Sequence, residues 1–127
     1  MCSFIVNVYP CQARLSRVRA ACGKDDTEAL WNGSRRRCDT EGRNYDEIER
    51  TTVNNMLVAR DEAALKAKRE RLHVPDKFQG FAVTVPQAVE LVSRYRDVGV
   101  QLFITSIHKN DAETQELLAA EVMPHFV

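Results

Sequence analysis

The strongest constraint on the fold is an almost continuous apolar run over Val100–Ile107. Successive side chains of a β-strand point to opposite faces of a sheet, so a strand that is apolar on both faces must be covered on both. Such strands are typical of parallel sheets flanked by helices. We therefore predict a buried parallel strand here and an α/β fold class.

Helical periodicity lies on both sides of this run. Before it, apolar residues recur at helical spacing after Pro86, which suits the first position of a helix, and Gly99 suits the residue that ends it. After it, Asp111 suits the N-cap of a last helix, which Pro124 terminates. Helix, glycine, buried strand and capped helix form the pattern of a β/α repeat.

Three further elements are expected upstream. The β-branched content of residues 51–58 predicts a strand, and Asp61 is placed to cap a helix that ends at His73-Val74-Pro75. An earlier helix is expected over Thr27–Thr40, with Gly42 in the left-handed conformation that ends it. On the helix after Asp61, we expect the charged residues to form the solvated side; they are Lys66, Lys68, Arg69, Glu70 and Arg71.

Composition narrows the class of protein. The chain has 127 residues, enough for one domain with a hydrophobic core. Its 18 basic and 18 acidic residues cancel, which argues against nucleic-acid and membrane partners. We expect a cytoplasmic protein, because no signal peptide or long apolar run is recognisable. The four cysteines lack metal-ligand spacing and are expected to be reduced thiols, with no metal bound.

Two stretches carry a family resemblance. Residues 38–51, which read CDTEGRNYDEIERT, resemble a segment of the luciferase-like monooxygenases, and especially of their deazaflavin-dependent members. Val85-Pro86-Gln87-Ala88-Val89, then residues 95–104, then Glu121-Val122-Met123-Pro124-His125-Phe126 are similar to the ending of that family. The order and spacing agree from about residue 36 to 126, whereas residues 1 to about 35 show no convincing family pattern.

The resemblance implies a fold and an activity. Family members are (β/α)8 TIM barrels that use FMN or coenzyme F420 for hydride transfer, or for flavin-mediated oxygenation of a small organic substrate. A barrel needs eight β/α units and roughly 250 residues, so this chain is expected to supply a partial barrel, the last two or so units. We predict that residues 36–127 are the C-terminal part of such an oxidoreductase and that the isolated chain is inactive. A homo-oligomer or pairing with the missing N-terminal half of the barrel is then expected.

The candidate site follows from the position of the last strand. Active sites of parallel barrels lie at the carboxyl ends of the strands, so Thr105 and Ser106 are the expected cofactor-binding residues. His108 is a candidate proton carrier, although a solvated loop histidine is the simpler interpretation. No catalytic residue is assigned.

Two other interpretations stay open. The chain could be a non-catalytic α/β interaction module derived from the same family. Alternatively, Arg35-Arg36-Arg37 could bind nucleic acid, but acidic residues follow closely, so a solvated helix face is the preferred interpretation.

Overall fold

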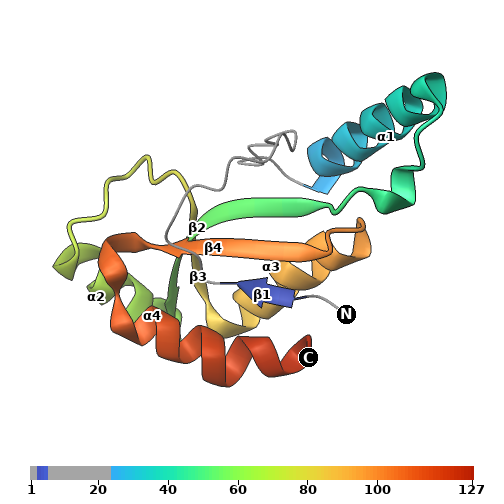
Figure 1. Cartoon of the computed structure of the whole chain (residues 1–127). Helices are drawn as coiled ribbons and strands as arrows, with labels where there is room; N and C mark the ends of the chain where they lie inside the picture. Colours follow the sequence, from blue (N-terminus) through green and yellow to red (C-terminus); the bar gives the residue numbers. More distant parts are fainter. Residues whose placement is uncertain (1–2, 6–23) are drawn as a thin grey trace.

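The computed structural model describes residues 3–5 and 24–127 (Figure 1), whose strands form one parallel four-stranded sheet. The strand order is β1-β4-β2-β3, and every neighbouring pair is parallel. The strands are β1 (Ser3–Ile5), β2 (Thr51–Ala59), β3 (Phe81–Thr84) and β4 (Leu102–Ile107). The α/β class with a parallel sheet is thus confirmed.

Helices connect and follow these strands. Helix α1 (Lys24–Glu41) lies at the amino end of β2 (Figure 1), and a short 3-10 turn, η1 (Tyr45–Glu47), joins the two. Helix α2 (Glu62–Arg71) follows β2, and α3 (Val85–Asp97) follows β3. After β4 come the turn η2 (His108–Asn110), helix α4 (Ala112–Leu117), the π-helical turn η3 (Leu118–Val122) and the 3-10 turn η4 (Met123–His125).

Strand β2 separates two apolar clusters, because its side chains alternate between the faces of the sheet. Met56 and Val58 face a larger cluster formed with α3, α4 and η3, which includes Phe103 of β4. Leu57 and Ala59 face a smaller cluster with Leu65, Leu72, Val74 and Phe78 from α2 and the loop that follows it. Helix α2 therefore covers one face, and α3 and α4 cover the other.

The strand order explains this division. The chain steps from β2 to β3 in one direction across the sheet, then crosses back over β2 to reach β4. Crossovers between parallel strands are right-handed, so steps in opposite directions put their helices on opposite faces. The carboxyl ends of the neighbouring strands β2 and β4 consequently lead to helices on different faces of the sheet.

The arrangement agrees only in part with the expected barrel. β2 and β4 are parallel neighbours, and α3 and α4 lie on the same face, as two successive units of a barrel would place them. β3 is an additional strand on the far side of β2, and β3 and β4 are not neighbours although they follow each other along the chain. The described residues thus form four parallel strands and do not show a barrel.

Most of the expected elements are present. The predicted strands 51–58 and 100–107 correspond to β2 and β4, and Asp61 caps α2 by accepting a hydrogen bond from the Ala64 amide at 2.8 Å. Gly42 has the expected positive φ of 67°. Strand β3 is absent from the sequence prediction. Three of the four cysteines lie outside the described residues, while Cys38 is a buried free thiol.

Arg50 fixes the amino end of the sheet. Its main-chain oxygen accepts hydrogen bonds from the Gln101 and Leu102 amides, and its Nε donates to the Gly99 oxygen at 2.8 Å. The guanidinium also lies over the Tyr45 ring, 5.0 Å from its centroid. Tyr45 and Arg50, which belong to the family-like segment 38–51, therefore hold the structure together at the amino ends of the strands. Ligands of parallel barrels bind at the other end, over the carboxyl ends.

Gly80 provides a test of the packing between β2 and the start of β3. A Cβ at this residue would lie 2.3 Å from the main-chain oxygen of Asn55, which cannot move without disturbing β2. We expect Gly80→Ala to lower the free energy of unfolding by about 1–3 kcal/mol, measured by chemical denaturation.

Gly33→Ala is the matched control, because Gly33 lies in α1 with nothing within 4 Å of the added Cβ. This change should leave stability unchanged or raise it by up to about 1 kcal/mol. Equal stability of the wild-type and Gly80→Ala chains would contradict the described approach of the two backbones.

Candidate functional site

The carboxyl ends of β2 and β4 form the edge at which parallel α/β sheets bind ligands. The preferred position is between neighbouring strands whose following helices lie on opposite faces, which is the relation between β2 and β4. β4 ends at Ile107, the partner of Met56, while β2 continues to Ala59. Beyond Met56, the main chain of β2 therefore has no strand beside it on the β4 side.

Side chains from the two helices complete the hydrogen bonding of this extension. The Val58 amide donates to Thr114 Oγ1 at 3.0 Å, and the Val58 oxygen accepts from Thr114 Oγ1 at 3.2 Å and from Lys68 Nζ at 2.6 Å. Asp111 Oδ2 accepts from Lys68 Nζ at 2.8 Å and from the Thr114 hydroxyl at 2.7 Å. Glu113 Oε2 lies 2.8 Å from Lys68 Nζ. The crevice is thus filled by a paired network of the protein itself.

Lys68 corrects the sequence prediction, which placed it on the solvated side of α2. Its side chain is only 2% exposed and its ammonium has three acceptors. The protein tolerates the buried ammonium group because two of its acceptors are carboxylates and the third is the main-chain carbonyl of Val58. The other charged residues of that set are exposed or half-buried, and Arg35, Arg36 and Arg37 are exposed as expected.

Asp111 remains ionised in this network. Burial by itself raises the pKa of its carboxyl group, but hydrogen bonds from Lys68 and from the hydroxyl and amide of Thr114, with the charge of Lys68, outweigh burial and lower the pKa below 3.8. The same carboxylate caps α4 through the Thr114 amide at 3.0 Å. One side chain therefore joins the start of α4 to α2.

The two predicted cofactor residues face opposite sides of the sheet. Thr105 has the orientation of Phe103, is fully buried on the face covered by α3 and α4, and its hydroxyl donates to the Ser106 oxygen at 3.2 Å. It cannot line a ligand site without unpacking that face. Ser106 is exposed on the other face, and its hydroxyl donates to the Asn54 oxygen at 3.4 Å.

We call the face that carries Ser106 the open face; its other members on β2 and β4 are Val53, Asn55 and Ile104. Val53 is 61% exposed, and Asn55 is the register partner of Ser106. α2 covers this face only further along β2, at Leu57 and Ala59. Part of the face that a parallel sheet normally buries is therefore accessible.

Two buried polar atoms without hydrogen-bond partners lie at this end of the sheet. They are Asn55 Oδ1 on β2 and His108 Nε2, immediately after β4. The His108 ring packs edge-on against Phe78, with centroids 5.1 Å apart, so it lies on the same side of the sheet as the α2 cluster. A buried polar atom without a partner costs about 1–3 kcal/mol. Sequence reasoning considered His108 but missed Asn55.

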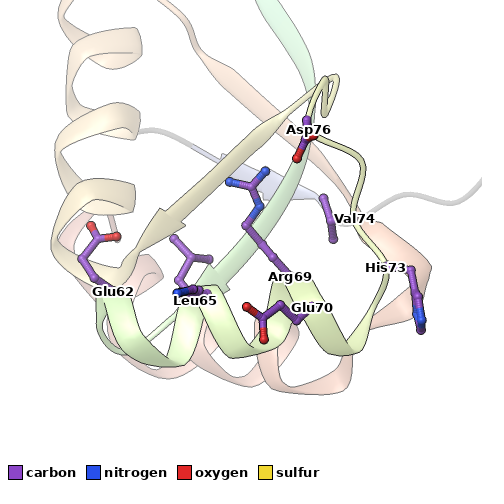
Figure 2. A pocket seen from close by; sticks show the side chains of 8 residues that line it. Glu62, Leu65, Arg69, Glu70, His73, Val74 and Asp76 are labelled. Carbon is purple, nitrogen blue, oxygen red and sulfur yellow. The ribbon is translucent and has the colours of Figure 1, made fainter.

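A shallow groove of about 400 Å³ lies beside α2 (Figure 2). The apolar side chains of Leu65 and Val74 line part of the groove, and its charged lining residues include Arg69 and Asp76. Figure 2 shows the Arg69 side chain extending along the sheet, away from the outer side of α2. Acidic and basic groups are mixed along this groove, so its charge selects no particular class of ligand.

Comparisons with protein-family models, with curated proteins and with solved structures found no match to this chain. Within the described ranges, no group of His, Cys, Asp and Glu side chains could hold a metal ion. In the same residues, no helix has the length and apolar character needed to cross a membrane. The case for a function therefore rests on the residues themselves.

The buried ammonium predicts a large effect of Lys68→Met. This change leaves the buried Asp111 with only the more distant Arg71 guanidinium, 3.6 Å away, so we expect the free energy of unfolding to fall by about 3 kcal/mol. Lys66→Met on the exposed side of the same helix should change it by less than about 0.5 kcal/mol. Equal stabilities of the two variants in urea denaturation would contradict the network.

The Asp111 carboxyl predicts a loss of stability in acid. Because its pKa is lower in the folded state, the unfolded chain takes up the proton first as the pH falls. The stabilisation is complete above the ordinary value of 3.8 and is lost as the pH falls through the lower, folded-state pKa. Asp111→Asn should be less stable at neutral pH and should flatten this acid dependence. An unchanged profile from pH 6 to pH 2 would show that Asp111 makes no contribution.

Proposed function

We propose that this chain provides the last β/α units of a flavin- or deazaflavin-dependent oxidoreductase of the luciferase-like type. The intact protein would act on a small organic substrate by hydride transfer or by flavin-mediated oxygenation. The observation that carries the proposal is the pair β2 and β4, whose carboxyl ends bear polar groups on an open face. In a barrel the cofactor would bind over the carboxyl ends of the strands, next to Ser106 and His108.

The sequence and the arrangement of elements support the same proposal. Residues 36–126 resemble the family ending in order and spacing, and this part of the chain contains β2 and β4 as parallel neighbours with α3 and α4 on one face. β2 and β4 would be neighbouring strands of such a barrel, and α2 and β3 would be an insertion between them. β1 and β3 are the outer strands of the described sheet, and a homo-oligomer or further barrel units would pair with them.

The residues of the open face fit a ring cofactor better than a metal ion or a phosphate group. Asn55, Ser106 and His108 supply hydrogen-bond donors and acceptors and no carboxylate. The unpartnered Asn55 Oδ1 and His108 Nε2 are the groups that a bound heterocycle would satisfy. The cofactor supplies the redox chemistry, and the protein holds and orients its ring.

A non-catalytic α/β interaction module is the second candidate function. The 61% exposure of Val53 favours it, because a face that a parallel sheet normally buries would be covered by another protein. Cofactor binding therefore separates the two candidates.

Fluorescence titration with FMN and with coenzyme F420 tests the proposal. We expect the full chain to quench the fluorescence of at least one of them at micromolar protein concentration, and heat-unfolded chain to cause no quenching. Absence of quenching by either cofactor at millimolar protein would reject the oxidoreductase proposal and favour the interaction module.

A further inference from the structure

The open face has no covering layer, among the described residues, over its apolar half. Val53 of β2 and Ile104 of β4 are register partners on this face, and Val53 is 61% exposed. α2 covers the same face only further along β2, at Leu57 and Ala59. A parallel sheet normally has both faces buried, so the apolar pair marks a place that another segment is expected to cover.

The strand order indicates which connection crosses this face. From β1 to β2 the chain passes over β4, in the same direction across the sheet as its later step from β2 to β3. Right-handed crossovers that run in the same direction lie on the same face of the sheet. The connection from β2 to β3 contains α2 and lies on the open face. The connection from β1 to β2 is therefore expected on the open face as well, over β4 and β2.

α1 belongs to this connection but does not provide the cover. It extends away from the sheet at the amino end of β2 (Figure 1), and Val53 is exposed beside it. The connection also contains residues 6–23, which lie outside the described residues. They follow Ile5, the register partner of Ile104, and precede Lys24 at the start of α1. This segment therefore begins one strand away from the apolar pair.

The sequence of residues 6–23 has the pattern of a crossover helix. Apolar side chains recur at helical spacing in one stripe; they are Cys11, Leu15, Val18 and Cys22. Pro10 suits the start of a helix and Gly23 suits its end. A helix over residues 11–22 would be roughly 18 Å long, enough to pass over strands that are about 4.8 Å apart. The arginines of the segment fall outside the stripe; they are Arg14, Arg17 and Arg19.

From these observations we propose that residues 11–22 form a helix that packs on the apolar half of the open face. Leu15 and Val18, at the centre of the stripe, lie over the register pair of β2 and β4. The polar half of the face, nearer the carboxyl ends of the strands, stays outside this contact. The inference goes beyond the proposed function and does not rest on it, because a cofactor would bind at the carboxyl ends.

Methyl NMR of the full chain tests this contact without any substitution. With Ile, Leu and Val methyl groups labelled, we expect nuclear Overhauser effects between Leu15 or Val18 and Val53 or Ile104. A mixture of differently labelled chains distinguishes contacts within one chain from contacts between two copies. Absence of these effects would overturn the inference. Effects that occur only between chains would also overturn it, because a second copy would then cover the face.

Substitutions provide an independent measurement. Leu15→Asp would place a charge against the apolar pair, so we expect it to lower the Tm by about 5 °C or more. Ala20→Asp, on the opposite side of the same predicted helix, is the matched control and should have a much smaller effect. Val53→Asp should also lower the Tm, and the double variant with Leu15→Asp should lose less than the sum, because both changes break one contact. Equal effects of Leu15→Asp and Ala20→Asp, or a Val53→Asp chain as stable as the wild type, would overturn the inference.

The inference and the proposed function can fail separately. The expected contacts of Leu15 and Val18, without binding of FMN or coenzyme F420, would support the inference and reject the oxidoreductase proposal. Binding of either cofactor by a chain that shows none of these contacts would overturn the inference and leave the oxidoreductase proposal standing.

Discussion

The hydrogen bonds around Val58 determine how the two halves of the structure meet. β2 extends past the end of β4, and an extended main chain with no neighbour would leave a buried amide and carbonyl without partners. Thr114 from α4 and Lys68 from α2 take the place of the missing strand. Because these helices cover opposite faces of the sheet, the contacts at Val58 join both layers at one point. Asp111 holds the two side chains together.

This network also affects where a ligand can bind. The crevice between the carboxyl ends of β2 and β4 is the usual site in a sheet of this topology, but here it is filled by paired charges. The open face carries polar groups instead, of which Ser106 is exposed and Asn55 is half-buried, with its Oδ1 inaccessible to solvent. A stable, closed crevice and an adjacent face with unpartnered atoms are consistent with separate structural and binding roles.

The sequence predicted the features that depend on local patterns. The apolar run of β4, the Asp61 and Asp111 caps and the left-handed Gly42 follow from nearby residues, and all are present. The errors arise from contacts between distant segments. Lys68 looks like any lysine on an amphipathic helix, and only its contact with Asp111, 43 positions away, makes it a buried residue. β3 is too short to have a clear period, and it forms because Gly80 permits close approach to Asn55.

One part of the candidate site could be predicted from the sequence, and the other part could not. Alternation along a strand already implies that Thr105 and Ser106 face opposite sides, whereas the pairing of Asn55 with Ser106 requires the register of two strands. Backbone resonances of the isotope-labelled full chain, followed by NMR during addition of FMN, test most directly whether the open face is the functional surface. We predict that the largest shifts occur at Asn55, Ser106 and His108. Shifts confined to the α2 groove around Arg69, or no shifts at all, would contradict the account.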